Sequence, residues 1–434
     1  MPTRINFNVE TLGKCKYDSP VKKGDFTGDS DRILYEISLE SFQRAKTRKS
    51  DPLTMEVAGP RREIFFDPNK TRAGFVTCGG LCPGINDVIR GAVMTLWYVY
   101  GVREIYGFRY GYQGLVPCYF HDPLRLTPQM VEDIHKEGGS VLSSSRGPQD
   151  PKVMVNTLER MGINILFTIG GDGTQRGSLA LHEEAKRRGL KIAMVGVPKT
   201  IDNDLCFIEK SFGFETAFSA GADALKGAHE EAVGAPNGIV IVKLMGRQSG
   251  FIAANAAIAL NDVNIVLVPE VPFKLEGEKG LLAHIEKRLR TRRHALLLVA
   301  EGAGQELMES EAKKAGKDAS GNVKLIDIGR FLVDSFDTHF KKIGLEANIK
   351  YIDPSYIIRS VPANPTDSVY CLQLAQNAVH AAMAGRTGMV VGQWNNTFVN
   401  IPIAMATMKR NTIDPDGQLW RNVLESTGQP ANWE

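Results

Sequence analysis

The sequence predicts an α/β protein built on mainly parallel sheets, with polar groups collected where the strands end. The prediction rests first on a recurring order of short apolar strand, glycine or polar turn, and helix. It rests second on residues 163–205, in which two apolar runs, 163–169 and 192–197, flank a helical segment from 174 to 188. This is a βαβ unit, so both strands should leave the same edge of one sheet.

Composition is ordinary for a globular protein with a large core. The chain has 434 residues, of which 43% are hydrophobic and 23% are charged. The small net charge of +3 argues against a nucleic-acid-binding protein, and no window of about 18 apolar residues predicts a membrane span. Six scattered cysteines complete no zinc set, and the N-terminus lacks a signal-peptide core. We therefore expect a cytoplasmic protein with reduced thiols.

The first half of the chain contains an extension and two glycine-rich strand ends. Residues 1–65 are polar with basic clusters, and we expect one short helix near 31–46 but no sustained strand. A strand at 74–78 runs into a glycine turn at 79–86, which opens a helix and could bring phosphate oxygens to backbone N–H groups. The loop 138–147 holds small residues and one arginine, Arg146, so it is either a phosphate contact or a plain surface turn.

The second half repeats the strand, turn and helix order. Strands are expected at 238–243, 264–268 and 294–299, and helices at 215–232, 250–260, 280–293, 328–342 and 367–384. Residues 309–324 are polar and glycine-bearing, which predicts a mobile loop. Residues 351–359 should be extended, and a β-rich tail should begin at 388.

Acidic and basic side chains follow the predicted strands. Asp172, Asp202 and Glu301 stand at strand ends, and turns nearby supply Arg247 and Arg359. Asp172 and Asp202 should face one crevice, because ligands of open α/β sheets bind outside the carboxyl ends of the strands. One carboxylate could hold Mg²⁺ against phosphate oxygens and another could accept a hydroxyl proton. A single strand-end aspartate is more often a helix cap or turn former, but two such motifs at βαβ spacing favour a phosphoryl-transfer site.

These motifs together identify a family resemblance. From about residue 74 to about residue 410 the chain resembles the phosphofructokinase family, and it is most similar to the long-chain ATP-dependent branch with plant and kinetoplastid members. The motifs that carry the resemblance are Gly79-Gly-Leu-Cys-Pro-Gly-Ile-Asn86, Gly170-Gly-Asp-Gly-Thr174, Pro198-Lys-Thr-Ile-Asp-Asn-Asp204, Met245-Gly-Arg247 and Tyr356-Ile-Ile-Arg359.

The resemblance implies a domain organisation. It implies two Rossmann-like α/β domains with mainly parallel sheets, an active site in the cleft between them, and an N-terminal extension at 1–70. Residues 71–212 would form the ATP-binding domain, completed by part of 364–434, and residues 213–363 the domain that binds fructose 6-phosphate. Residues 364–434 would pack back on the core as a helix and tail. A homo-oligomer, either tetramer or dimer, and allosteric behaviour are also implied.

The resemblance also implies residue roles. Asp202 would take the proton from the sugar 1-hydroxyl with Thr200 beside it, Asp172 would hold Mg²⁺, and Arg146 would stabilise charge on the transferring group, with Lys199 also in the catalytic set. ATP would be contacted by Gly80, Arg146, Gly147, Gly171, Asp172, Gly173, Thr174 and Gly177. Fructose 6-phosphate would be held by Thr200, Asp202, Met245, Gly246, Arg247, Glu301, Lys350, Tyr356 and Arg359.

Donor choice depends on two residues that point in opposite directions. Pyrophosphate-using relatives usually carry Asp at the position of Gly173, so this glycine favours ATP. Lys199 occurs in many pyrophosphate users but also in the long ATP-using branch. The expected activity is therefore ATP-dependent 6-phosphofructokinase of glycolysis, and the pyrophosphate-dependent enzyme is the alternative.

Two further alternatives and two departures bear on this assignment. NAD kinases and lipid kinases share Gly-Gly-Asp-Gly-Thr but lack the Thr-Ile-Asp-Asn-Asp and Met-Gly-Arg elements. A non-catalytic regulatory subunit should carry a damaged catalytic set, which this sequence does not. Two arginines that short bacterial enzymes use in phosphate binding are replaced by Gly238 and Lys350. A lysine binds phosphate only as a point charge, so neither the cooperativity nor the effector pocket of those enzymes is assumed.

Overall fold

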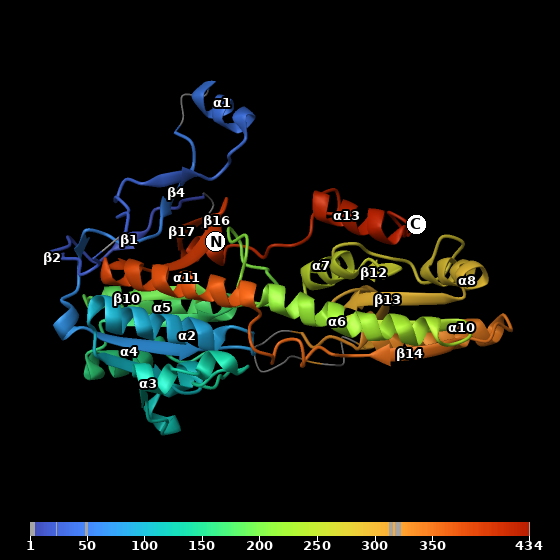
Figure 1. Cartoon of the computed structure of the whole chain (residues 1–434), viewed down its shortest axis with the longest axis horizontal. Coiled ribbons are helices and arrows are strands. Elements are labelled where there is room, and N and C mark those ends of the chain that lie inside the picture. Colours follow the sequence, from blue (N-terminus) through green and yellow to red (C-terminus); the bar gives the residue numbers. More distant parts are fainter. Residues whose placement is uncertain (1–4, 23, 48–50, 312–315, 317–322, 434) are drawn as a thin grey trace. The chain divides into compact units, whose positions relative to one another are not determined.

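Two α/β units, each with its own sheet, make up the chain. The computed structural model describes residues 5–22, 24–47, 51–311, 316 and 323–433. Unit 1 and unit 2 interleave along the sequence, so each is built from separated segments (Figure 1). Unit 1 comprises Met1–Thr200, Leu205–Gly213 and Ser360–Arg410, and unit 2 comprises Ile201–Asp204, Phe214–Arg359 and Asn411–Glu434.

Unit 1 is organised around one mixed sheet. Among the described residues the sheet has nine strands, in the order β3-β4-β17-β16-β10-β9-β6-β7-β8. The run from β16 to β7 is parallel, and the outer strands on both sides are antiparallel. The strands are β3 (Arg32–Leu34), β4 (Thr54–Val57), β6 (Arg72–Thr77), β7 (Glu104–Phe108), β8 (Leu124–Arg125), β9 (Ile165–Gly170), β10 (Ala193–Pro198), β16 (Met389–Trp394) and β17 (Thr397–Pro402).

Helices cover both faces of this sheet. α2 packs with α11, and α4 packs with α5. Val76 and Leu166 face the α4 and α5 side, and strand alternation turns the neighbouring Phe75 and Phe167 to the opposite face, where their rings stack at 4.8 Å. The helices are α1 (Leu39–Thr47), α2 (Ile85–Met94), α3 (Pro128–Val131), α4 (Pro151–Met161), α5 (Asp172–Arg187), α11 (Pro365–Met383) and α12 (Ile403–Ala406).

Unit 2 contains a smaller, wholly parallel sheet. Its order among the described residues is β12-β13-β11-β14, made of β11 (Gly238–Leu244), β12 (Ile265–Leu267), β13 (His294–Ala300) and β14 (Asn348–Ile352). Its helices are α6 (Phe214–Val233), α7 (Phe251–Leu260), α8 (Leu281–Arg292), α10 (Ile328–Lys342) and α13 (Gln418–Thr427). The expected mobile loop at 309–324 falls largely outside the described residues.

The C-terminal segment is part of the core of unit 2. Trp433 is buried in the apolar cluster that β11, β13, α8 and α10 form. The side chain of Gln429 pairs with Val266 on the edge strand β12, accepting from its N–H at 2.6 Å and donating to its carbonyl at 3.2 Å. The prediction of a β-rich tail from residue 388 is correct for β16 and β17 only. After these strands the chain continues as the helices α12 and α13.

The N-terminal extension, in which no sustained strand was expected, contains strands of only two to four residues. β1 (Glu10–Thr11) pairs with β15 (Arg386–Thr387), β2 (Tyr17–Asp18) pairs with β5 (Glu63–Ile64), and β3 and β4 extend the main sheet. These strands are too short to show an alternating pattern. β1, β2 and β4 also pair with strands that lie far away in sequence, namely β15, β5 and β17. Other short elements outside the two large sheets are η1 (Pro68–Lys70), η2 (Thr95–Tyr100), η3 (Gly111–Leu115), η4 (Pro117–Tyr119), η5 (Ile134–Lys136) and η6 (Gln305–Met308).

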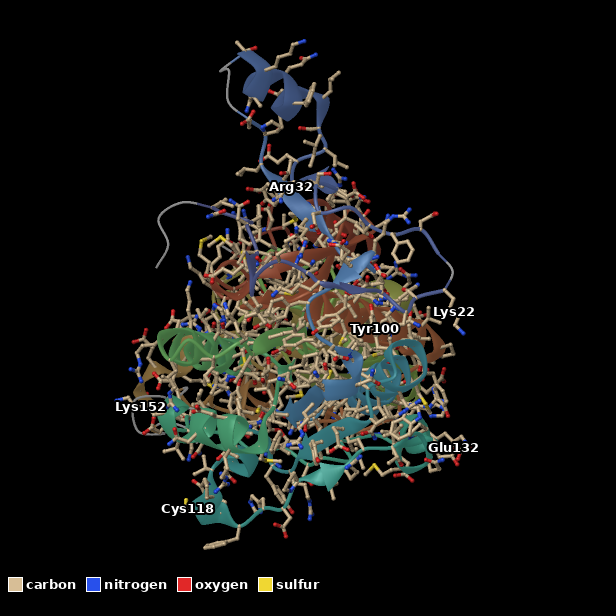
Figure 2. The ribbon with its side chains drawn as sticks, turned by 90° about the vertical axis from the view of Figure 1, so that its left-hand side faces the viewer. Lys22, Arg32, Tyr100, Cys118, Glu132 and Lys152 are labelled. Atoms are coloured by element: carbon tan, nitrogen blue, oxygen red, sulfur yellow. The ribbon has the colours of Figure 1, made fainter. Side chains whose placement is uncertain are left out.

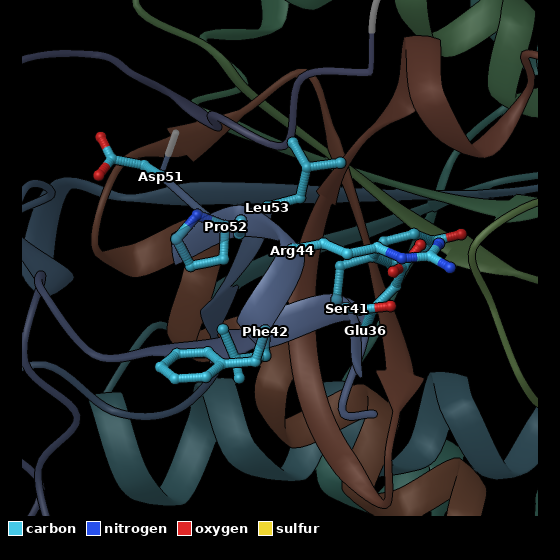
Figure 3. A pocket seen from close by; sticks show the side chains of 10 residues that line it. Glu36, Ser41, Phe42, Arg44, Asp51, Pro52 and Leu53 are labelled. Atoms are coloured by element: carbon cyan, nitrogen blue, oxygen red, sulfur yellow. The ribbon is translucent and has the colours of Figure 1, made fainter. Parts of the chain in front are cut away.

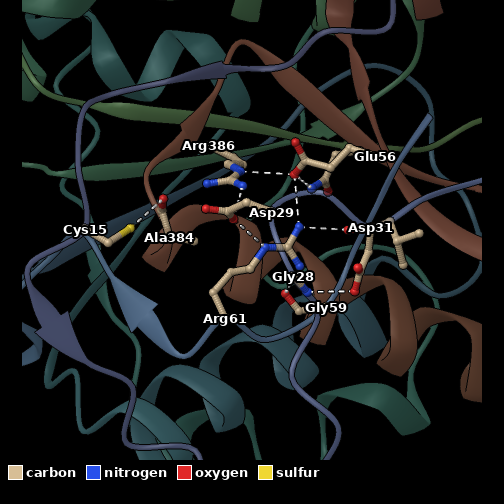
Figure 4. Close-up of polar contacts among 11 residues, drawn as sticks. Cys15, Gly28, Asp29, Asp31, Glu56, Gly59, Arg61, Ala384 and Arg386 are labelled. Carbon is tan, nitrogen blue, oxygen red and sulfur yellow. Dashed lines mark hydrogen bonds and ion pairs between the residues drawn. The ribbon is translucent and has the colours of Figure 1, made fainter. Parts of the chain in front are cut away.

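A buried ionic network anchors the extension to the sheet (Figure 4). One carboxylate oxygen of Glu56 accepts from Arg61 at 3.1 Å, Arg386 at 3.0 Å and Asn400 at 2.8 Å. Both arginines also contact the exposed carboxylate of Asp29, at 3.2 and 2.6 Å. Burial lowers the pKa of Arg61, and the Glu56 carboxylate is the largest opposing influence. Glu56 and Asp29 together thus neutralise two arginines that would otherwise be buried without a counter-charge.

The helix expected near 31–46 begins later, at Leu39. Residues 32–34 form β3 instead. The guanidinium of Arg32 donates to the Thr54 hydroxyl at 2.7 Å and so links β3 to β4, the two strands between which the segment with α1 leaves the sheet (Figure 2). No residue of α1 is buried. A hollow of about 360 Å³ lies between α1 and the chain segments on either side of it, bordered by side chains that include Phe42 and Leu53 (Figure 3). Within the described residues no helix has both the length and the apolarity needed to cross a membrane.

Candidate active site

Three parallel strands of unit 1 end together and place three motifs at one edge. Thr77 of β6 pairs with Ile169 of β9, and Gly170 of β9 pairs with Pro198 of β10. The glycine turn 79–86, the turn 170–174 and the segment that begins at Lys199 all leave the sheet here. The predicted βαβ unit is confirmed, with its helix at Asp172–Arg187.

The first glycine turn is joined to the small-residue loop that carries Arg146. The N–H of Gly79 donates to the Ser145 carbonyl at 3.0 Å, and the Ser144 hydroxyl donates to the Gly79 carbonyl at 2.7 Å. Thr77 donates to the Ser143 carbonyl at 2.5 Å. The side chain of Arg146 is exposed next to this junction. The structure therefore brings Gly80 and Arg146, which are separated by 66 positions in the sequence, to the same strand edge.

The second glycine turn leaves an open helix N-terminus. Gly171 precedes α5 in an extended conformation, and because it is a glycine it provides no side chain to cap the helix. Asp172 is the first helical residue; its side chain is 20% exposed, and its carboxylate accepts from Arg176 at 3.1 Å. A Cβ placed on Gly173 would meet no atom within 4 Å. An anion that approaches this turn therefore meets backbone N–H groups and the positive end of the helix dipole.

The next turn of α5 is packed against Tyr112. The Tyr112 hydroxyl donates to the Thr174 carbonyl at 2.6 Å. A Cβ on Gly177 would come within 2.6 Å of the Tyr112 ring, so a glycine is required for this contact. Thr174 itself is buried.

Gln175 was not predicted as part of the site. It is fully buried, and its amide nitrogen donates to the carbonyls of Gly170 at 2.9 Å, Thr168 at 3.1 Å and Val197 at 3.4 Å. It therefore holds the ends of β9 and β10 together beneath the turn. The signal in the sequence was an uncharged polar residue on the face of the helix that is otherwise buried.

Lys199 extends from β10 to the first glycine turn. The side chain is almost fully buried, and its ammonium donates to the Gly80 carbonyl at 2.6 Å. Burial raises the pKa of the nearby Cys78 thiol to about 12, and the positive charge of Lys199 opposes this rise. Cys78 is therefore a packing residue, and Lys199 fixes the carbonyl side of the turn that holds Gly80.

The chain crosses from unit 1 to unit 2 within the Thr-Ile-Asp-Asn-Asp motif. Thr200 belongs to unit 1, and its carbonyl accepts from the Ser211 hydroxyl at 2.5 Å. Asp202 belongs to unit 2, where its carbonyl accepts from the Ser249 hydroxyl at 3.2 Å. Asn203 is left-handed, with φ 53°. That Asp172 and Asp202 face one crevice stays a prediction.

In unit 2 the Met-Gly-Arg turn is fastened to the strand end that carries Glu301. The N–H of Glu301 donates to the Leu244 carbonyl at 2.9 Å, and the N–H of Gly302 donates to the Gly246 carbonyl at 3.0 Å. A Cβ on Gly302 would lie 2.0 Å from the Arg247 carbonyl oxygen, and Gly246 has a φ of 134°. Both glycines are therefore needed for this close approach.

Charged groups meet at the same edge. The guanidinium of Arg247 donates to the Val323 carbonyl at 2.6 Å. Burial raises the pKa of Glu301, while Arg247 and then Lys243 oppose the rise and Asp353 adds slightly to it. Met245 stands between Leu244 and Gly246 and is partly exposed. The structure thus brings Met245, Arg247 and Glu301 together in unit 2.

Residues 351–359 are not extended throughout, which corrects the sequence prediction. β14 ends at Ile352, and the N–H groups of Ile357 and Ile358 both fold back to the Pro354 carbonyl. Tyr356 is 72% exposed, and the guanidinium of Arg359 lies 4.7 Å from its ring centroid. The apolar run 356–358 is typical of a strand, but here it follows Pro354 and forms a turn against the carbonyl of that proline.

Lys350 lies apart from the other predicted sugar-binding residues of unit 2. It stands within β14, before the strand end, and forms an ion pair with Glu231 of α6. Glu231 is itself partly exposed, so the pair is near the surface.

Comparison with known proteins agrees with this architecture. The family model described as Phosphofructokinase matches residues 72–382. The chain is 49% identical to a protein of Borreliella burgdorferi named ATP-dependent 6-phosphofructokinase, over 99% of this chain and 98% of that one. It is 46% identical to a Trypanosoma brucei brucei protein of the same name, over 98% of this chain and 88% of that one.

A solved structure shows the same fold at much lower identity. It is titled as a pyrophosphate-dependent phosphofructokinase from Marinobacter aquaeolei, with a TM-score of 0.68, 19% identity, and coverage of 82% of this chain and 91% of that chain. The predicted α/β fold class is confirmed by this likeness and by the two sheets. The match to the family model and the near full-length identities confirm the resemblance seen in the sequence: the chain belongs to the phosphofructokinase family.

Proposed function

We propose that the protein is an ATP-dependent 6-phosphofructokinase, which transfers the γ-phosphoryl group of ATP to the 1-hydroxyl of fructose 6-phosphate. Two relatives that align with at least 98% of the chain bear that name. The observation that carries the choice of donor is the open space around Gly173 in the first turn of α5. A nucleoside triphosphate needs this space, and a side-chain carboxylate there would repel its phosphates.

The donor half lies in unit 1. We assign the donor phosphates to Gly80, Arg146 and Gly147, and to the turn of Gly171, Asp172, Gly173 and Thr174, with Gly177 near the nucleotide. Support comes from the uncapped N-terminus of α5 and from the exposed guanidinium of Arg146 at the same edge. Both features are suited to phosphate oxygens.

Asp172 is the residue that we propose for Mg²⁺. Within the described part of the chain no group of three acidic, histidine or cysteine side chains could form a metal cage. Mg²⁺ fits a single carboxylate, because it usually takes one or two protein carboxylates and completes its shell with water and substrate phosphates. Bound there, it would neutralise charge on the donor phosphates. Asp172 is partly exposed at the open turn, as this role requires.

The sugar half lies in unit 2. We assign fructose 6-phosphate to Met245, Gly246, Arg247, Glu301, Tyr356 and Arg359, and Lys350 is included because of its charge alone. Arginines suit a sugar phosphate because the guanidinium can bind two phosphate oxygens at once. A carboxylate such as Glu301 suits sugar hydroxyls, which donate hydrogen bonds to it.

Residues of the segment that links the two halves would carry out the chemical step, together with Arg146 of unit 1. Asp202 would accept the proton of the 1-hydroxyl as the oxygen attacks the γ-phosphorus, with Thr200 positioning the hydroxyl. Arg146 would stabilise negative charge on the transferring group, and Lys199 would hold the Gly80 turn. Positioning and electrostatic stabilisation provide most of the catalysis in phosphoryl transfer.

We also propose that the protein works in the cytoplasm as a homo-oligomer, a tetramer or a dimer. The six cysteines, all within the described residues, form no disulfide, as in a reducing compartment. Light scattering coupled to size-exclusion chromatography would measure the mass of the assembly. A monomer at working concentration would contradict the oligomer.

A two-donor assay tests the proposed function. Purified protein, Mg²⁺ and fructose 6-phosphate are incubated with ATP or with pyrophosphate, and fructose 1,6-bisphosphate is measured. We expect product with ATP and little with pyrophosphate. Turnover with pyrophosphate alone would overturn the choice of donor, and no turnover with either would overturn the activity.

A further inference from the structure

Lys243 is a charged residue in a strand that is otherwise apolar. β11 reads Gly-Ile-Val-Ile-Val-Lys-Leu, and the side chain of Lys243 is only 12% exposed. A lysine is buried at a cost unless it is paired and hydrogen-bonded. Because it directly precedes Leu244 and the Met245-Gly246-Arg247 turn, any group that holds Lys243 also holds the start of that turn.

Two carboxylates and one aromatic ring surround the ammonium group. The ammonium lies 2.9 Å from a carboxylate oxygen of Asp353 and 3.3 Å from one of Asp327. It also lies 5.7 Å from the centroid of the Tyr351 ring. The Tyr351 hydroxyl donates to the same oxygen of Asp327 at 2.8 Å. The four side chains form one connected network at the carboxyl end of the sheet in unit 2.

Each carboxylate of the network organises a different segment. Asp353 accepts from the Ser355 N–H at 3.1 Å and from its hydroxyl at 2.5 Å, which shapes the turn that leads to Tyr356 and Arg359. Asp327 caps the N-terminus of α10 by accepting from the N–H of Gly329 at 3.1 Å. One buried cation therefore joins the Arg247 turn to the Tyr356 turn.

We propose that Lys243 is a positioning residue for the sugar phosphate, which fixes the turn of Arg247 relative to the turn of Tyr356 and Arg359. The inference rests on the proposed function, because it takes these three residues to belong to the sugar-binding set. Lys243 is not offered as a proton donor or acceptor: Tyr351 and Asp353 raise its pKa despite burial. It therefore stays charged at any pH at which the enzyme is assayed.

The same charge acts on Glu301. Three charged groups face this carboxylate: Arg247 and Lys243 lower its pKa, and Asp353 raises it, all against the larger effect of burial. If ionised Glu301 binds the sugar, kcat/KM for fructose 6-phosphate falls as pH drops through the pKa of Glu301. Removal of Lys243 should move this acid limb to higher pH, and removal of the Asp353 charge should move it to lower pH.

Lys243→Met and Asp353→Asn test the proposal together. Both break the ion pair, so both should raise KM for fructose 6-phosphate by about ten-fold or more, the usual cost of a lost charged hydrogen bond. KM for ATP should change less than about two-fold, because its contacts are assigned to unit 1. The acid limbs of the two variants should shift in opposite directions, a result that simple loss of packing would not give.

Two further variants serve as controls. Lys243→Arg keeps the charge and should recover most of the affinity for fructose 6-phosphate. Lys226→Met removes an exposed lysine of the same unit, which forms an ion pair with Asp223 across one turn of α6, and should change nothing. Thermal unfolding of every variant identifies those that are not folded, and Asp353→Asn, which retains an acceptor for Ser355, decides if Lys243→Met unfolds.

The proposal is overturned if KM for fructose 6-phosphate is unchanged in both variants, or if KM for both substrates rises equally. It is also overturned if the acid limbs do not move apart. Failure of the proposed function gives a separate result, because the unaltered protein would then neither phosphorylate fructose 6-phosphate nor bind it in calorimetry.

Discussion

The two halves of the candidate site use different chemical groups, backbone groups at glycines in unit 1 and side chains in unit 2. In unit 1 the residues assigned to the donor are largely glycines, at positions 80, 147, 171, 173 and 177, around the N-terminus of α5. In unit 2 the residues assigned to the sugar are mostly charged or aromatic side chains held in a network that includes Lys243 and Asp353. One half offers backbone N–H groups and open space, and the other offers paired charges.

This difference predicts how each half can fail. A site formed by backbone groups selects ligands by the space that its glycines leave open, so an added side chain should weaken ligand binding most. A charged site depends on the geometry of its pairs, so replacement or removal of a partner should damage it most. The first kind of change should affect KM for ATP, and the second should affect KM for fructose 6-phosphate.

The largest effect is expected at the segment that joins the halves. Asp202→Asn removes the proposed base while keeping the shape of the side chain, so kcat should fall by about 10²- to 10⁴-fold. Both KM values should change little, which a stopped assay with each substrate varied in turn would measure. Asp223→Asn, an exposed position on α6, is the matched control and should be silent. A fall in kcat of less than ten-fold would refute the assignment of the base.

The next largest effect is expected from Gly173→Asp in the donor half. A Cβ at this position meets no protein atom within 4 Å, so the carboxylate fits the fold but lies where donor phosphates approach. Repulsion should lower kcat/KM for ATP by about 100-fold or more, while KM for fructose 6-phosphate should stay the same. The helix dipole stabilises an acidic residue in the first turn, so the melting temperature should not fall.

Gly173→Asn separates charge from size. The amide has the same shape without the negative charge, so it should retain much more activity with ATP than the aspartate variant does. Equal losses in the two variants would show that bulk, and not repulsion, limits the site. An unchanged rate with ATP in Gly173→Asp would remove the argument for the donor altogether.

The same contrast explains what could be predicted from the sequence. The βαβ unit at 163–198 was predictable, because local periodicity and a glycine turn define it. The short strands of the extension were not, because β1 finds its partner β15 almost the whole chain away. Gln175 and Lys243 were missed because a buried polar residue has meaning only through partners, such as Asp353, that the sequence does not place beside it.

In the sugar half, Arg247→Lys should have an intermediate effect. Lysine keeps the charge but loses the two-point binding of a phosphate, so KM for fructose 6-phosphate should rise by about 10- to 100-fold. KM for ATP and the melting temperature should be unchanged, which gives the mirror image of the result for Gly173→Asp. A rise in KM for ATP of similar size would show that the two halves are not separable in the way that the assignments require.

The smallest effect is expected where the donor half contains an ion pair. The carboxylate of Asp172 accepts from Arg176, an exposed residue on the next turn of α5. If Asp172 holds Mg²⁺ as proposed, the ion competes with this pair, so Arg176→Met should lower the concentration of Mg²⁺ that gives half-maximal rate by about two-fold, the usual strength of an exposed pair of this spacing. Because salt screens exposed charges, the difference from the unaltered protein should shrink at high ionic strength. A higher requirement for Mg²⁺ in Arg176→Met would mean that Arg176 helps to bind the donor, and the donor half would then depend on paired charge as the sugar half does.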